Sequence, residues 1–153
     1  MMNNLVMTRL IASGWSKERN VDYSSIEGAY RENGIKMPDA IKDFFQSFAY
    51  LEVKVSCLDG DIECHCFNPI HSFAWDKKEY LEHIFDDYGI FGMAYPLGDA
   101  CDYNMILYMH ENGHFYLFMD GGPLIDIGDS VDNMLNNLIG NSADDWAYLN
   151  PIS

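Results

Sequence analysis

The sequence is short of positive charge, and the few basic residues that it has are confined to its first half. It carries 9 Lys and Arg against 24 Asp and Glu, a formal net charge of −15 over 153 residues. All nine basic residues lie between Arg9 and Lys78, whereas Glu79 to Ser153 contains 13 acidic residues and not one Lys or Arg. Binding to the phosphates of nucleic acid, or to an anionic membrane, needs basic side chains. The composition therefore argues against both nucleic acid and a membrane surface as partners.

Cysteine is also scarce, and long apolar runs are missing. Four Cys in 153 residues are too few for a disulfide scaffold, so we expect free thiols in a reducing compartment. No segment approaches the 18 consecutive apolar residues of a membrane-spanning helix. The N-terminal residues lack the basic start of a signal peptide. Together these absences predict a cytoplasmic protein.

Cys64-His65-Cys66 is the densest group of possible metal ligands, and its spacing does not suit zinc. Alternation along a strand puts the two Cys on one face, which we expect to be the core face, and leaves His65 exposed on the other. Phosphate-binding glycine loops, serine-hydrolase elbows and metalloprotease motifs are absent from the sequence. The sequence thus predicts no metal, no cofactor and no catalytic residue. A nucleophilic Cys/His pair that uses Cys57 or Cys101 stays open as an alternative.

The sequence does contain enough apolar residues for one folded domain spanning 1–153. Hydrophobic residues make up 48% of the chain and aromatic residues 14%. Helical spacing with capping and stop residues predicts helices over 4–13, 24–33, 38–48, 76–88 and 130–139. Alternation predicts strands over 52–57, 62–67, 92–95, 103–109, 114–119 and 124–127, with 96–102 as a loop. Helices followed by antiparallel hairpins indicate an α+β fold, in which helices pack on a twisted, mainly antiparallel sheet.

The uneven charge has two interpretations. An acidic surface keeps a small protein soluble, which explains a moderate negative charge. A complete lack of basic residues over the last 75 positions is instead typical of a surface that attracts a cationic partner. Composition alone gives the two interpretations equal weight.

Five short motifs occur in order along residues 5–140. They are Gly14-Trp15 with Arg19, Phe44-Phe45 with Phe48 and Leu51, Tyr95-Pro96-Leu97-Gly98, Glu111-Asn112-Gly113 with Tyr116, and Gly128-Asp129-Ser130. The ordered set resembles the SUKH superfamily, in particular its third subgroup. One departure is Ala49-Tyr50, which stands where two glycines are common in that family.

The resemblance implies an α+β fold and the role of an immunity protein in a bacterial polymorphic toxin system. Such proteins bind a cognate toxin, frequently a nuclease or deaminase, and the family is not regarded as enzymatic. It also implies structural roles: Trp15 as a buried anchor, Pro96 and Gly98 as the bend leaving a strand, and Gly113 as a hairpin turn.

This resemblance favours the second interpretation of the charge. A toxin that acts on nucleic acid carries Lys and Arg along its substrate groove, and an inhibitor can offer carboxylates in place of phosphates. We expect a basic nuclease or deaminase domain as the partner. The alternatives are an intracellular SUKH-type scaffold or regulatory module that is not paired with a toxin, and the small Cys/His enzyme. The candidate partner-binding residues are acids expected in or beside loops: Asp99, Asp102, Asp120, Asp126 and Asp129.

Overall fold

The computed structural model describes residues 1–56, 60–100, 104–119, 121–140 and 151–152. Its helices are α1 (Asn4–Ala12), α2 (Ser24–Glu32), α3 (Asp39–Phe48), α4 (Lys78–His83) and α5 (Val131–Ile139), with short 3₁₀ helices η1 (Ile70–Ala74) and η2 (Asp86–Tyr88). Its strands are β1 (Glu52–Ser56), β2 (Ile62–Cys66), β3 (Ala94–Ala100), β4 (Met105–His110), β5 (Phe115–Phe118), β6 (Leu124–Gly128) and β7 (Pro151–Ile152). The strands form one antiparallel sheet in sequence order. The predicted α+β fold is confirmed.

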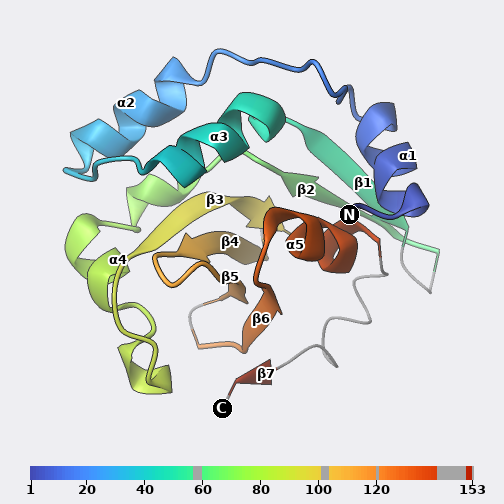
Figure 1. Ribbon diagram of the computed structural model, residues 1–153. Coiled ribbons are helices and arrows are strands. Elements are labelled where there is room, and N and C mark those ends of the chain that lie inside the picture. Colours follow the sequence, from blue (N-terminus) through green and yellow to red (C-terminus); the bar gives the residue numbers. More distant parts are fainter. Residues whose placement is uncertain (57–59, 101–103, 120, 141–150, 153) are drawn as a thin grey trace.

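The helices cover the sheet in two groups (Figure 1). Helices α2 and α3 lie across the β1–β3 part of the sheet, and α1 and α5 lie beside each other. Helix α1 contacts β1 near one end of the sheet, while α5 contacts β6 near the other end. The Arg9 side chain of α1 donates a hydrogen bond to the carbonyl of Ile139 at the end of α5. This pair of helices therefore links the two ends of the curved sheet.

Aromatic rings form much of the core on both sides of the sheet. Phe44 and Phe48 of α3 contact the ring of Phe67, which follows β2. Phe85, between α4 and η2, contacts the rings of Tyr108 and Phe118. All four residues of β5 are buried, so both faces of this strand are covered. Aromatic side chains bury large areas, and they fix how α3 and α4 sit on the sheet.

The Gly-Trp…Arg motif connects the loop after α1 to the end of α3. Trp15 is buried and its ring stacks on Phe48, with centroids 6.0 Å apart, which confirms its role as an anchor. The Arg19 guanidinium donates hydrogen bonds to the carbonyls of Ser47 (2.8 Å) and Ala49 (2.7 Å). These carbonyls at the helix end have no partner within the helix, so Arg19 supplies the missing donors. The motif thus fixes the C-terminal end of α3.

Several local predictions were wrong because tertiary contacts outweigh local signals. The sequence from Ser24 to Glu27 predicts a helix capping box, but these residues form none; instead Asp22 accepts a hydrogen bond from the Ser24 backbone N–H. The helix predicted over 76–88 is broken into α4 and η2, and this break places Phe85 in the core. The sequence offers Asp129 or Ser130 as the cap of α5, and the structure has Ser130, whose side chain accepts a hydrogen bond from the Asn133 backbone N–H.

The segment predicted as a loop over 96–102 is a strand up to Ala100. Pro96 has no N–H to donate, yet it lies within β3, opposite Tyr108 of β4. Its free carbonyl accepts a hydrogen bond from the Tyr30 hydroxyl. The register shifts between Pro96 and Gly98, so the bend implied by the family motif is an irregularity inside β3 rather than its end.

The two faces of β2 are the reverse of the prediction. His65 is fully buried, whereas Cys64 and Cys66 are only half-buried. The register explains the reversal, because His65 lies opposite Val53 of β1, whose side chain is in the core. Residues directly opposite in an antiparallel pair share a face, so the two Cys point to the other side.

Candidate functional site

The five predicted partner-binding acids do not form a single cluster. Asp99 lies inside β3 and is 7% exposed, so its placement in an exposed loop was wrong. Asp126 lies on β6, three strands away, which corresponds to about 14 Å at the usual strand spacing. Asp129 is exposed just before α5. Asp102 and Asp120 lie outside the described residues.

Asp126, on β6, and Asp129, just before α5, are each held by a neighbouring side chain. The Asp126 carboxylate lies 2.8 Å from Nδ1 of His114 and accepts a hydrogen bond from the Gly128 backbone N–H. The Asp129 carboxylate accepts a hydrogen bond from the Asn133 side chain, and this bond lowers the pKa of Asp129. Hydrogen bonds thus hold both carboxylates at fixed positions beside the β6–α5 connection.

Asp99 belongs to a row of side chains that crosses three strands. Glu52 of β1 lies opposite Cys66 of β2, and Cys66 lies opposite Asp99 of β3. Opposite residues share a face, so this row is on the side of the sheet away from buried Val53 and His65. Next to Asp99, a Cβ atom on Gly98 would lie 2.0 Å from the Cys66 carbonyl oxygen. Only glycine allows the two strands to approach this closely.

This row lines a groove of about 400 Å³, which we call the Asp99 groove. Its walls are Tyr50, Glu52, Cys66, Asn68, His71 and Asp99. Tyr50 is 37% exposed and has φ 68°, in the left-handed region that favours glycine. Tyr50 is also the position of the departure from the glycines common in the SUKH family. At the edge of this groove, an exposed aromatic side chain thus stands at a position whose backbone conformation favours glycine.

The Asp99 groove contains two acidic side chains, Glu52 and Asp99, and one imidazole, His71. Burial raises the pKa of Asp99, and the nearby His71 imidazole opposes this effect. Burial, with the neighbouring Cys64 thiol and nearby acids, raises the pKa of Cys66 to about 12. The His71 side chain therefore favours the ionised form of Asp99.

A second hollow lies beside this groove on the same face of the sheet. Ile106, directly opposite Asp99, lines it together with Trp75, Asp76, Tyr80 and Tyr108, among others, around about 180 Å³. Asp76 is 1% exposed and accepts a hydrogen bond from the Tyr108 hydroxyl at 2.8 Å. From its position before the helix predicted over 76–88, Asp76 was expected to cap that helix. Instead its side chain is buried against Tyr108, and α4 begins at Lys78 without a side-chain cap. Trp75, in contrast, is 57% exposed.

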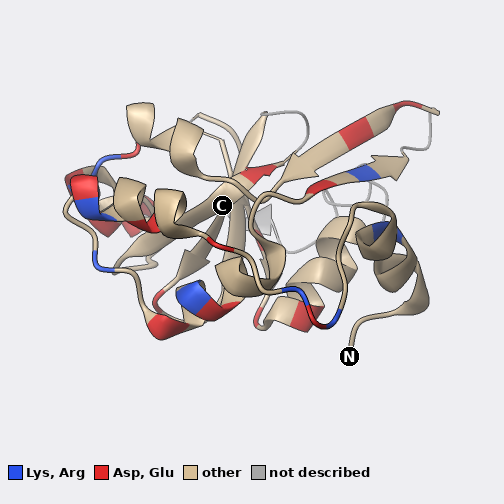
Figure 2. Cartoon of the chain, turned by 90° about the horizontal axis from the view of Figure 1, so that it is seen from above, with Lys and Arg blue, Asp and Glu red and all other residues tan. Residues whose placement is uncertain are grey.

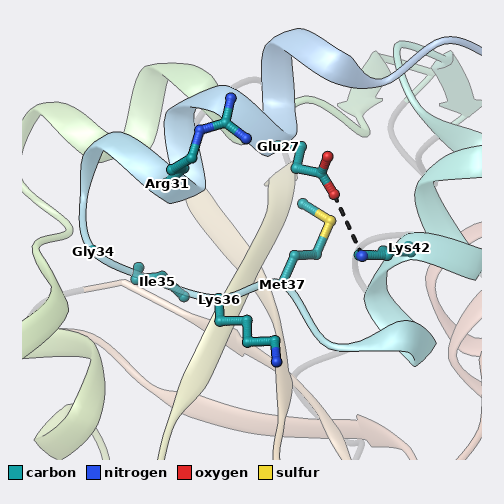
Figure 3. A pocket seen from close by; sticks show the side chains of 7 residues that line it. All are labelled: Glu27, Arg31, Gly34, Ile35, Lys36, Met37 and Lys42. Atoms are coloured by element: carbon teal, nitrogen blue, oxygen red, sulfur yellow. Dashed lines mark ion pairs between the residues drawn. The ribbon is translucent and has the colours of Figure 1, made fainter.

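A pocket of opposite character lies where α2 leads into α3 (Figure 3). It measures about 490 Å³ and is lined by three basic side chains, Arg31, Lys36 and Lys42, and one acidic side chain, Glu27. Lys42 forms an ion pair with Glu27 at 3.7 Å, whereas no described carboxylate pairs with Arg31 or Lys36. Acidic residues elsewhere are spread over helices, strands and connections (Figure 2). The basic pocket and the Asp99 groove thus differ in the sign of most of their charged side chains. The pocket lies near the start of α3, and Tyr50 of the groove follows the end of α3.

The described residues offer no support for a catalytic or metal centre. They contain no group of three or more His, Cys, Asp and Glu side chains placed to hold a metal ion. A thiol with a pKa of about 12 stays protonated at neutral pH, so Cys66 is no nucleophile. Cys57 and Cys101, the Cys of the alternative enzyme hypothesis, lie outside the described residues. Nor does any described helix have the length and apolar character needed to cross a membrane.

The sequence identified Asp99 but missed the side chains around it. Tyr50 could have been found from the sequence, because it departs from the glycines of the family motif. No sequence feature pointed to Asp76 and Trp75, since their place beside β4 depends on the break after α4. The grouping of Glu52 with Asp99 follows from strand register, which alternation within each strand does not determine.

Comparison with known proteins identifies the family. The family model described as SUKH-3 immunity protein matches residues 2–141. Searches of curated proteins and of solved structures gave no match. The match covers the five ordered motifs, including Trp15 and Arg19 at the end of α3, and all described elements except β7. The chain therefore belongs to the SUKH-3 immunity protein family.

Proposed function

We propose that the chain neutralises a cognate protein toxin by binding it in the cytoplasm of the producing cell, without catalysis of its own. The toxin is a basic domain that acts on nucleic acid, such as a nuclease or deaminase. The observation that carries this proposal is the charge distribution: a family member with net charge −15 has 13 acids and no Lys or Arg beyond Lys78.

The proposal follows from what a nucleic-acid-acting toxin needs. Its substrate groove is lined by Lys and Arg that bind phosphates. Carboxylates form charge-assisted, often bidentate hydrogen bonds with Arg, so an acidic protein competes with the nucleic acid for the same side chains. A net charge of −15 also raises the rate of encounter with a cationic protein. An inhibitor of a fast toxin benefits from both effects.

The described acids provide two places for such contacts. Asp126 and Asp129 lie beside the β6–α5 connection, and Asp99 lies in its groove on β3. Asp102 and Asp120 complete the proposed set. Whether the acids cover the active site of the toxin or a neighbouring surface depends on the toxin, and either mode uses the same charge complementarity.

Co-expression with a toxin domain tests the proposal. The toxin domain to test is a basic C-terminal domain of a large secreted protein, to be sought among the open reading frames next to the one that encodes this chain. Expression of that domain alone should stop bacterial growth, and co-expression of this chain should restore it, together with a purified one-to-one complex. Failure to bind or protect against this domain, with stable binding to a cellular protein instead, would support the scaffold alternative and refute the toxin assignment.

A further inference from the structure

The basic pocket between α2 and α3 gathers positive charge in a chain that has little of it. Three of the nine basic residues line this hollow of about 490 Å³: Arg31, Lys36 and Lys42. Glu27 is the one acidic side chain among the lining residues, and it is paired with Lys42 at 3.7 Å. No carboxylate of the described residues forms an ion pair with Arg31 or Lys36. The pocket therefore carries two uncompensated positive charges, although the net charge of the chain is −15.

Unpaired backbone donors occur in the same wall of the pocket. Lys36 and Met37 lie in the connection between α2 and α3, and both line the pocket. Within the described part of the chain, no group accepts a hydrogen bond from the backbone N–H of Lys36 or Met37, although Met37 is only 4% exposed. A backbone N–H withdrawn from water ordinarily has an acceptor. A ligand with several acceptor oxygens would provide it.

We propose that the basic pocket binds a phosphate monoester of a small organic molecule, with the phosphate group held by Arg31 and Lys36. The inference goes beyond the proposed function, because the pocket shares no residue with the acids assigned to the toxin. A phosphate monoester carries a charge of about −1.5 to −2 at neutral pH and three strong acceptor oxygens, which match two uncompensated cations. The planar Arg31 guanidinium can pair with two phosphate oxygens at once, and Lys36 adds a compact point charge.

The apolar part of the pocket favours an attached organic group over free phosphate. Ile35 and Met37 are buried, and they line the pocket together with the basic side chains. In Figure 3 the Met37 side chain lies between Arg31 and the Glu27–Lys42 ion pair. The unbranched Met side chain adapts to ligands of different shape. A hollow of about 490 Å³ is in the size range of small-molecule sites, so it has room for more than a phosphate group.

Exposed acids near the pocket disfavour a long polyanion such as RNA. Glu32 follows Arg31 on α2, and Asp39 and Asp43 are on α3 with Lys42. All three acids are exposed. They repel the successive phosphates of a nucleic acid, which needs many basic contacts along its length. A small ligand needs only the cations that line the pocket.

A titration with phenyl phosphate tests the pocket directly. Full-length, isotope-labelled protein is titrated at low salt and about pH 8, where the phosphate carries two charges, and backbone amide shifts are followed by NMR. Inorganic phosphate, the singly charged diester methyl phenyl phosphate, and a short acidic peptide serve as comparison ligands. The double variant Arg31→Gln/Lys36→Gln removes both uncompensated charges. The variant Lys17→Gln/Lys54→Gln, at two exposed positions outside the pocket, is the matched control.

We expect phenyl phosphate to shift the amides of Gly34, Lys36 and Met37 most, and inorganic phosphate and the diester to bind there more weakly. The double variant at the pocket should bind phenyl phosphate at least about tenfold more weakly, and the control less than about twofold. Both variants should keep the melting temperature of the natural protein, because the substituted side chains are exposed.

Shifts spread evenly over all basic residues, unchanged affinity in the double variant, or equal affinity for inorganic phosphate would each refute the inference. Tighter binding of the acidic peptide at the same amides would also refute it, and would assign the pocket to an acidic segment of a partner protein. The toxin is not used, so none of these results alters the outcome of the co-expression assay.

Discussion

Asp76 gives the strongest test of the electrostatics of this fold. Its carboxyl is 1% exposed, and the only described hydrogen bond that it accepts comes from the Tyr108 hydroxyl, at 2.8 Å. The pKa of Asp76 is raised from 3.8 to about 6, because burial and, to a smaller extent, the negative charge of Asp99 outweigh the Tyr108 hydrogen bond, which lowers it. Asp76→Asn removes the charge but keeps an oxygen that accepts from Tyr108. The substitution should therefore stabilise the protein at neutral pH.

The sign and size of the effect follow from linkage between protonation and folding. Between the unfolded pKa of 3.8 and the folded pKa of about 6, the folded state binds the proton more tightly. The contribution of Asp76 to stability therefore decreases as pH rises through this window. At 1.36 kcal/mol per pH unit, the ionised form is disfavoured by about 3 kcal/mol at neutral pH. Asp76→Asn should gain up to this amount near pH 7 and about half as much near pH 5.

Urea unfolding followed by tryptophan fluorescence, from about pH 5 to about pH 8, measures this gain as the difference in free energy of unfolding. Asp43→Asn is the control, because it removes one exposed acid and changes the net charge equally. The control should change stability by less than about 0.5 kcal/mol at every pH. An Asp76→Asn variant that is no more stable than the natural protein at neutral pH, or whose gain does not grow with pH, would refute the reasoning.

Three further predictions concern the Gly-Trp…Arg motif and the thiols. Trp15→Ala should cost about 3–5 kcal/mol and lower the melting temperature, since the indole stacks on Phe48; an unchanged melting curve with lost partner binding would place Trp15 in the interface. Arg19→Lys should cost about 1–2 kcal/mol by thermal unfolding, because one ammonium does not reproduce the planar pair of bonds to Ser47 and Ala49; an unchanged melting temperature would contradict this role. Metal analysis and alkylation of the four Cys should show folding that is independent of zinc; stoichiometric zinc whose removal unfolds the protein would overturn this prediction.

Those parts of the fold that depend on local patterns were predictable from the sequence. Alternation correctly placed Val53 and Val55 in the core, and the Gly113 turn joins β4 and β5 as expected. The facing of β2 was not predictable in this way, because residues 62–66 carry no clear apolar alternation. Their register with β1 decides that His65 is inside. In such a segment, the pairing with neighbouring strands, rather than the residue pattern within the strand, determines which side chains face the core.

For the candidate site, charge could be predicted from composition but its arrangement could not. The absence of Lys and Arg after Lys78 indicated an acidic surface, and Asp99 was selected for its place after the Tyr-Pro motif. The structure instead buries Asp99 in a strand and brings Glu52, 47 positions earlier, onto the same face. The two sequence halves with different charge meet in one sheet where β2 pairs with β3. A long-range pairing of this kind leaves no local sequence signal.

The central claim is that the acidic surface directs binding to a cationic toxin. Stopped-flow association with the cognate toxin domain, across a salt series, measures this most directly. Screening shortens from about 10 Å at 0.1 M to about 3 Å at 1 M salt, so the association rate should fall steeply as salt rises.

Charge reversal at Asp99, Asp126 or Asp129, or at Asp102 or Asp120, should slow association or weaken binding. Equivalent reversal at Asp22 or Glu32, exposed in the nearly neutral first half, should have little effect. A salt-independent rate, or greater sensitivity at Asp22 and Glu32 than at the proposed acids, would contradict the account.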